Sequence, residues 1–238
     1  MSTSAAAATS TSPATSTRVF WERLWRSSGI QFIAFFLLAY IIYGDQPRVG
    51  ASADALVAFY HGARARVLIA VVISGLNVLN LMWLAAALRT ALADADQAGW
   101  GAAATAASAA LGALFFVLLT VVAALAYSIA GSGNAALISG LNDFAWALLV
   151  LTSFPRAMLI MSGVFGFWRA GVISNALFGI GVIAVLLGVL GGTTWFVGGF
   201  WAPDGAYSRF IWPMVGLLWI VFVSWILLTR RPSARAEW

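Results

Sequence analysis

The chain has 238 residues, of which 62% are hydrophobic and 9% charged, and its formal net charge at pH 7 is +5. A water-soluble domain of this size carries far more charge on its surface, so the composition indicates an integral membrane protein. The lack of cysteine and lysine and the single histidine, His61, exclude thiol chemistry, a retinal Schiff base and haem held by paired histidines.

The first segment, residues 1–17, is small, polar and low in complexity, and it is predicted to be disordered. Arg18, Arg23 and Arg26 then precede a first apolar run at residues 30–43. That run ends in YGDQPR rather than in a small-residue cleavage site. We therefore expect a retained membrane span, although a short one, and not a signal peptide.

Five further apolar segments follow, and about 20 such residues suffice to cross hydrocarbon. They cover residues 67–88, 104–129, 141–164, 171–190 and 210–228. Before the second, residues 55–66 are expected to form a helical extension outside the hydrocarbon, starting near a cap at Ser52 or Asp54. The sequence thus predicts an all-α fold: a six-helix transmembrane bundle over residues 18–231, followed by a tail, 232–238.

The arginines predict how the bundle is oriented, because the side richer in basic residues is normally cytoplasmic. The richer side holds Arg18, Arg23, Arg26, Arg89, Arg169, Arg230, Arg231 and Arg235, and the other side holds Arg48, Arg64, Arg66 and Arg209. Both termini are therefore predicted to be cytoplasmic. The alanine-rich, lysine-free composition suggests a bacterial source, and so a multi-pass protein of the bacterial inner membrane.

Three stretches of the chain resemble a group of bacterial, actinobacterial-type integral membrane proteins that are known only as a domain of unknown function. They are FYHGARARVLIAVVISGLNVLNLMWLAAALRTAL, SGLNDFAWALLVLTSFPRAMLIMSG and APDGAYSRFIWPMVGLLWIVFVSWILLTRR. The resemblance implies a six-helix membrane bundle. It implies no activity and no site residues.

Two charged residues of the fourth span, Asp143 and Arg156, require a partner or a purpose within the membrane. Asp143 is expected near the outer end, either as a carboxylate favoured by the start of a helix or in an ion pair with an arginine of the second span, Arg64 or Arg66. At thirteen positions apart, about 20 Å along a helix, the two cannot pair directly.

Arg156 is expected about 12 Å inside the cytoplasmic end of its helix, a depth from which its side chain can snorkel to the headgroups. Pro155 precedes it and should kink the helix, because proline cannot donate to the carbonyl of Leu151. Broken helices mark substrate sites in some transporters but also occur in structural bundles. Candidate partners for Arg156 are Asp94 and Asp96.

Two further features are candidates for binding. Asn77 and Asn80 lie three positions apart in the second span and should face nearly the same way, either as bonds between helices or as a polar solute site. The outer loop TTWFVGGFWAPDGAYS is unusually aromatic, which suits an interfacial belt or a docking surface for a lipid or another protein. Its aromatic residues are Trp195, Phe196, Phe200, Trp201 and Tyr207.

The sequence offers no convergent catalytic set, no metal ligands and no cofactor motif, and it lacks the dense basic run of nucleic-acid binders. We therefore expect a non-enzymatic accessory or structural subunit of a larger membrane assembly, with membrane lipids and other membrane subunits as partners. The alternative is a small-solute transporter or a lipid-binding bundle, which predicts a cavity that reaches Asn77, Asn80, Asp143 and Arg156.

Overall fold

The computed structural model describes residues 23–195 and 198–229, and all regular secondary structure within these ranges is helical. The predicted tails, 1–17 and 232–238, lie outside the described residues, as do Arg18, Arg230, Arg231 and Arg235. The long elements are α2 (Ser28–Tyr43), α4 (Arg64–Ala93), α5 (Ala98–Tyr127), α6 (Ala135–Leu151), α7 (Ser153–Arg169), α8 (Asn175–Gly191) and α9 (Trp212–Thr229). The short ones are α3 (Ala53–Tyr60), η1 (Ile129–Gly131), η2 (Gly199–Trp201) and η3 (Tyr207–Ile211).

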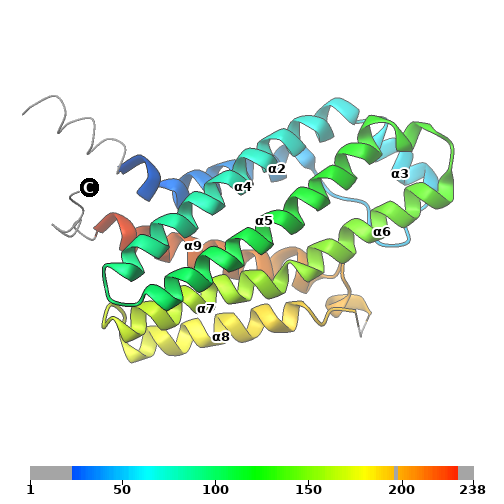
Figure 1. Cartoon of the computed structure of the whole chain (residues 1–238). Coiled ribbons are helices and arrows are strands. Elements are labelled where there is room, and N and C mark those ends of the chain that lie inside the picture. The colour runs from blue at the N-terminus through cyan, green and yellow to red at the C-terminus, as the bar shows by residue number, and fades with distance from the viewer. Residues whose placement is uncertain (1–22, 196–197, 230–238) are drawn as a thin grey trace, which may run out of the picture.

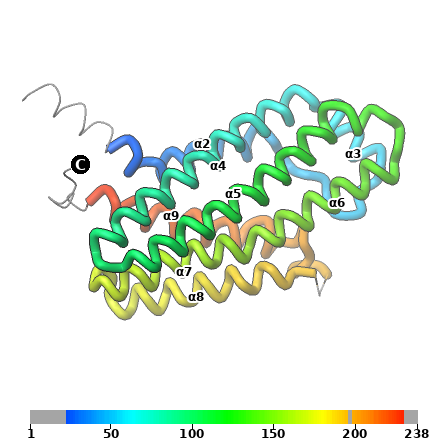
Figure 2. Tube along the Cα trace, viewed as in Figure 1, coloured from blue at the N-terminus to red at the C-terminus, as the bar shows by residue number. Residues whose placement is uncertain are grey.

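The long helices lie side by side in one elongated bundle (Figure 1). Helix α4 packs between α2 and α5, and α7 packs between α5 and α8, while α9 crosses behind them and touches α2, α4, α7 and α8. The trace in Figure 2 begins and ends its described part at one end of the bundle, and α3 lies at the other. A hydrogen bond from Arg26 Nη1 to the carbonyl of Leu227, 3.0 Å long, joins the two ends of the described chain there.

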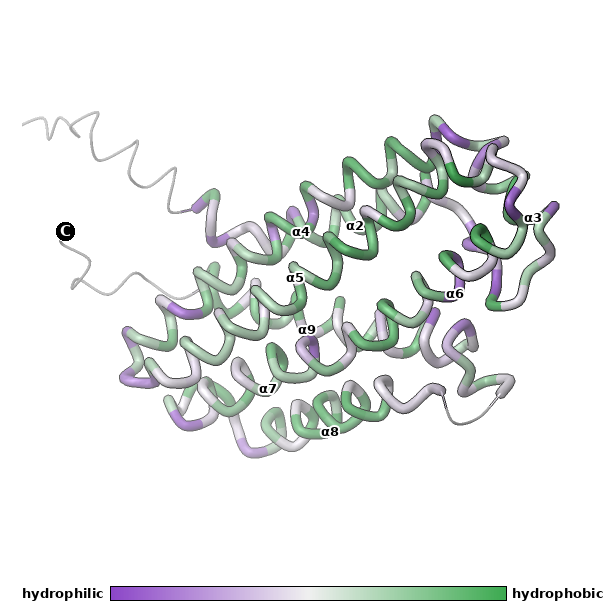
Figure 3. Tube along the Cα trace, turned by 45° about the vertical axis from the view of Figure 1, so that its right-hand side comes forward, coloured by the Kyte–Doolittle hydropathy of each residue, from purple (hydrophilic) through white to green (hydrophobic). Residues whose placement is uncertain are grey.

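Four helical segments are long and apolar enough to cross a membrane: Arg64–Ala93, Ala98–Gly131, Ala135–Arg169 and Tyr207–Thr229. Helices α2 and α8 are also apolar but shorter. Hydrophobic residues fill the middle of the bundle, and hydrophilic ones gather at its two ends (Figure 3). The protein is therefore an all-helical membrane protein.

The outer surface of the bundle carries large apolar side chains at helical spacing. On α4 the exposed residues follow a spacing of three and four: Ile69, Val72, Leu76, Leu79 and Trp83. Small polar residues such as Ser108, Thr152 and Ser162 are buried instead. A bundle that turns its apolar groups outward and its hydroxyls inward suits hydrocarbon rather than water as a solvent.

The second span was expected to continue without a break from the helical extension at residues 55–66, and the structure differs. Ser52 does cap α3, accepting a hydrogen bond from the amide of Ala55, but the helix ends at Tyr60 and α4 begins afresh at Arg64. A Cβ on Gly62 would lie 2.5 Å from the carbonyl oxygen of Ala58, so this tight break requires glycine. Two helices thus replace the single one that the pattern predicted.

The fourth span begins earlier than predicted and is broken where Pro155 indicates. Asn134 caps α6 through the amide of Leu137, so the helix starts at Ala135 rather than near residue 141. Helix α6 ends at Leu151 and α7 begins at Ser153, with Thr152 between them, because Pro155 leaves the Leu151 carbonyl without its helical donor. The break places a turn beside Arg156, deep within the bundle.

The start of α9 carries a wider turn than an α-helix. Residues Tyr207–Ile211 form the π-helical segment η3, and the amide of Trp212 donates to the carbonyl of Tyr207, five residues back. Such segments are rare and often lie at functional sites. This one carries Arg209, whose side chain is only 13% accessible.

Candidate functional site

A cavity of about 530 Å³ lies inside the bundle, a volume within the range of about 300–1,000 Å³ that is typical of small-molecule sites. Helices α2, α4, α5, α6, α7 and α9 all contribute to its walls, together with η3 and the loop that follows α2. Two buried apolar clusters contribute to its wall, one through Leu111 and Ile160 and the other through Val122. Most of its lining is aliphatic or aromatic, including Phe32, Phe36, Leu111, Phe115, Leu159 and Ile160.

Arg156 is a charged residue in the wall of this cavity. Its Nη2 donates to the hydroxyl oxygen of Thr152 at 2.8 Å, and its guanidinium carbon lies 5.4 Å from the ring centroid of Trp212 and 5.9 Å from that of Phe115. Thr152 is fully buried. The broken turn between α6 and α7 therefore holds the guanidinium, and two aromatic rings flank it.

Within the described ranges, no ion pair neutralises Arg156. A guanidinium carries five N–H donors, and the hydrogen bond to Thr152 uses one of them. The predicted partners, Asp94 and Asp96, lie in the turn between α4 and α5 and form no ion pair with it. The structure thus leaves a cation, with unused donors, beside an apolar cavity.

The two asparagines of α4 do not act as a pair. Asn77 lines the cavity, is only 6% exposed, and its Oδ1 has no hydrogen-bond partner in the described part of the chain. Asn80 does not line it, and its amide donates to the Leu76 carbonyl of its own helix. Of the two, only Asn77 offers hydrogen-bonding capacity to a ligand.

Asp143 lies two turns into α6 and contacts the loop after α2 instead of an arginine. Its Oδ1 accepts from the amide of Gly50 at 3.2 Å and from Nδ2 of Asn142 at 3.4 Å. Arg64 instead lies over the ring of Tyr127, and Arg66 over that of Phe59. The ion pair considered from the sequence does not form, and Asp143 is not in the cavity wall.

The residues next to Asp143 pin the same loop and were not singled out by the sequence. Asn142 is fully buried; it donates to the Arg48 carbonyl at 3.1 Å, and its Oδ1 accepts from the Tyr60 hydroxyl at 2.9 Å. Trp146 donates from Nε1 to the Pro47 carbonyl at 2.9 Å. Three side chains of α6, those of Asn142, Asp143 and Trp146, thus hold residues 47–50 against the bundle.

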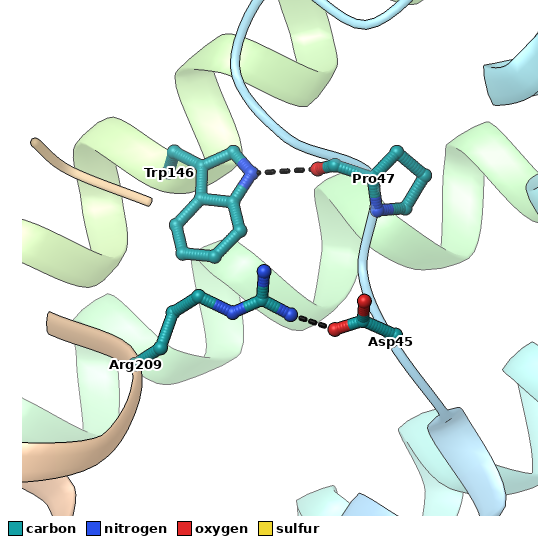
Figure 4. Close-up of polar contacts among 4 residues, drawn as sticks. All are labelled: Asp45, Pro47, Trp146 and Arg209. Carbon is teal, nitrogen blue, oxygen red and sulfur yellow. Dashed lines mark hydrogen bonds and ion pairs between the residues drawn. The ribbon is translucent and has the colours of Figure 1, made fainter. Parts of the chain in front are cut away.

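An ion pair between Asp45 and Arg209 completes this closure (Figure 4). The guanidinium of Arg209 also lies 6.0 Å from the Trp146 ring centroid, so it bridges the loop, α6 and the start of α9. Both residues line the intramembrane cavity and also a second, more polar cavity of about 620 Å³ that contains Arg48 and Asp204. The pair therefore lies between this second cavity, which we call the vestibule, and the apolar cavity.

The sequence analysis did not single out this pair. It could have been suggested by two opposite charges, Asp45 just after the first apolar run and Arg209 just before the last one.

Tyr60 connects α3 to the contacts that hold the loop after α2 against α6. It is fully buried, and burial raises the pKa of its hydroxyl to about 12. The neutral phenol donates to Asn142. The end of the bundle that carries α3 is thereby fixed around one buried polar contact.

The aromatic outer loop divides into inward and outward residues. Tyr207 is buried and donates to the Leu187 carbonyl, and the ring of Trp201 packs on it at 4.3 Å between centroids. Trp195 and Phe200 are exposed, and Phe196 lies outside the described residues. The candidate docking surface therefore reduces to Trp195 and Phe200.

Within the described ranges, no group of three or more histidine, aspartate or glutamate side chains is placed to hold a metal ion. No protein-family model, curated protein or solved structure matches the chain. The resemblance to uncharacterised bacterial membrane proteins accordingly stays a prediction.

Proposed function

We propose that this protein binds an anionic small molecule within the membrane, as a lipid-binding bundle or a small-solute transporter. The observation that supports the proposal is Arg156, a cation without a carboxylate partner in the described ranges, in the wall of a ligand-sized apolar cavity.

The argument rests on what a charge costs in hydrocarbon. Placing arginine at the centre of a membrane helix costs about 2.5–3.5 kcal/mol on insertion scales. A purely structural bundle would offset that cost with an acidic neighbour, whereas Arg156 faces Thr152, aromatic rings and open space. An anionic ligand supplies the missing charge and can engage the unused donors of the guanidinium.

We further propose that the bundle crosses the bacterial inner membrane six times, with both termini cytoplasmic. The contact between Arg26 and Leu227 supports an even number of crossings, because it brings the beginning and the end of the described chain together. Residues 23–26 are also helical and precede α2, which lengthens the first segment towards the thickness of hydrocarbon. The apolar outer stripes then face lipid.

A second candidate is the accessory-subunit role expected from the sequence. The exposed aromatic residues Trp195 and Phe200 favour it, since tryptophan and phenylalanine are enriched where proteins meet one another. Native mass measurement after extraction in a mild detergent tests this role. A stable complex that depends on both aromatic side chains supports it, and a lone monomer under all mild conditions contradicts it.

The primary proposal is tested by native mass spectrometry of protein released from nanodiscs, with the bound material identified by its mass. We expect the wild-type chain to retain an anionic ligand and the Arg156→Gln variant to lose it. Arg156→Lys preserves the charge and should retain part of the binding. Arg89→Gln, at the exposed inner end of α4, is the matched control. Equal ligand retention by all four proteins would contradict the proposal.

A further inference from the structure

We infer that the ligand is a single-chain amphiphile with an anionic headgroup, and that it enters sideways from the hydrocarbon between α2 and α9. The inference rests on the proposed function and specifies its ligand. Three features carry it: an opening towards lipid, a closed path towards water, and a polar site within an apolar cavity.

The opening lies where α2 and α9 separate. At their inner ends the helices touch: Arg26 donates to the Leu227 carbonyl, and a Cβ on Gly29 would overlap Ser224 Oγ. Towards their outer ends, the cavity is lined by side chains that are also exposed on the surface of the bundle. These are Leu37 and Tyr40 of α2 and Phe210 and Met214 of the last span. The cavity therefore reaches the apolar exterior between these two helices.

The path towards the outer aqueous side is closed by the loop after α2. Gly44, Asp45 and Gln46 form part of the cavity wall, and the residues after them are bonded to α6 through Asn142 and Trp146. The pair between Asp45 and Arg209 spans the remaining distance to the last span. A ligand dissolved in water meets this closure, whereas a ligand dissolved in lipid meets the gap.

The interior matches an amphiphile with one small polar group. Arg156 supplies the charge, and two nearly buried groups in the same wall have unused hydrogen-bonding capacity: Oδ1 of Asn77 and Nε1 of Trp219, in residues that are 6% and 7% exposed. Neither atom has a partner among the described residues. The rest of the wall is mainly hydrocarbon, which suits an acyl chain, and the volume of about 530 Å³ is that of one small molecule.

The experiment uses the full chain in phosphatidylcholine nanodiscs and a palmitate analogue with a photoreactive diazirine in its chain. We expect cross-linked peptides from α2, α7 and the last span. Unlabelled palmitate should compete about ten- to a hundredfold better than cetyl alcohol, the gain expected from a hydrogen bond to a charged group. Acetate, which has the same headgroup and no chain, should not compete.

Entry is tested with substitutions on the outer surface. Leu37→Trp combined with Met214→Trp narrows the gap and should slow labelling several-fold. Leu218→Trp places the same bulk on an exposed position of the same helix outside the cavity and should leave the rate unchanged. Equal rates in the double variant and the control would overturn lateral entry between α2 and the last span.

The outcomes separate this inference from the proposed function. Equal competition by cetyl alcohol overturns the anionic headgroup, and competition by acetate as strong as that by palmitate overturns the amphiphile. If native mass spectrometry finds a ligand that depends on Arg156 but palmitate does not label the cavity, only this inference fails. If no such ligand is found and no probe labels the cavity, both fail.

Discussion

Asp45 and Arg209 form an ion pair that links the loop after α2 to the π-helical start of the last span, above a cavity inside the membrane. Asp45 is largely exposed, with 80% of its side chain accessible, whereas the side chain of Arg209 is only 13% accessible. The pair thus joins a carboxylate in contact with solvent to a cation held against Trp146. Ion pairs with an exposed partner contribute about 0–1 kcal/mol to the free energy of unfolding. We therefore expect this pair to matter for closing the cavity rather than for the stability of the fold.

Asp45→Asn should open the outer end of the cavity. Because the wild-type chain has no cysteine, a single Asn77→Cys substitution reports access to the cavity by its reaction with a membrane-impermeant maleimide. We expect labelling to become several-fold faster in the Asp45→Asn background, with thermal stability nearly unchanged. Asp204→Asn, which removes a carboxylate from the vestibule but no ion pair of the described residues, is the control. The same rate in both variants would show that the pair does not close the cavity.

Asn142→Ala should be among the most destabilising polar substitutions in the chain. It leaves the buried Tyr60 hydroxyl without its acceptor and removes one of the two hydrogen bonds that the Arg48 carbonyl accepts, at a cost of about 2–4 kcal/mol in the free energy of unfolding. Denaturant unfolding in detergent micelles measures this loss. Asn80→Ala, which removes only a bond within one helix, should change stability by less than about 0.5 kcal/mol. A comparable loss in both variants would contradict the role given to Asn142.

The buried phenol of Tyr60 should make stability fall at high pH. Its pKa is raised to about 12 in the folded protein, while an exposed tyrosine titrates near 10. Between these values the unfolded chain releases the proton and the folded chain keeps it, so the free energy of unfolding falls as pH rises, by roughly 2–3 kcal/mol in total. Unfolding measured from pH 9 to pH 12 should show this decline in the wild type. The Tyr60→Phe variant is less stable from the start, but its free energy of unfolding should fall less steeply with pH. An equally steep fall in both proteins would contradict the role given to the Tyr60 hydroxyl.

Two glycines of α8 should respond oppositely to alanine. A Cβ on Gly188 would lie 2.4 Å from the Trp212 ring and 2.8 Å from Ala157, so Gly188→Ala should cost about 1–3 kcal/mol through overpacking. Gly179 has no atom within 4 Å of such a Cβ, so Gly179→Ala should be neutral or stabilising through helix propensity. Thermal unfolding of the two variants gives the comparison. Because Trp212 flanks Arg156, Gly188→Ala should also weaken ligand binding.

The helical fold was predictable because each apolar run is a local property of the sequence. The run at residues 67–88 falls within α4, the run at 104–129 ends two residues beyond α5, and Pro155 indicated the break between α6 and α7. The predicted helix boundaries were wrong where a capping side chain or a steric restriction sets the end of a helix. Asn134 moved the start of α6, and Gly62 separated α3 from α4.

The cavity could be predicted only in part, because it depends on how helices are rotated about their axes. A spacing of three suggested a common direction for Asn77 and Asn80, yet a rotation of about 60° between such positions is enough to put one in the cavity wall and the other against its own helix. Arg156 was identified because charge is rare in apolar segments. Asn142 and Trp146 were missed, because each donates to a backbone carbonyl more than ninety residues away, and such an acceptor leaves no trace in side-chain patterns.

Because of the wide turn at Tyr207–Ile211, we expect the last span to tolerate the deletion of one residue. A π-helical turn holds one residue more than an α-helical turn, so deleting Ser208 should convert it to an ordinary turn without shifting the register of Trp212 and the residues beyond it. The same deletion would rewind the turn that carries Arg209 and so change the direction of its side chain relative to Trp212. We therefore expect the deletion to weaken the ion pair with Asp45 and to release the loop after α2, while the rest of the bundle stays in place.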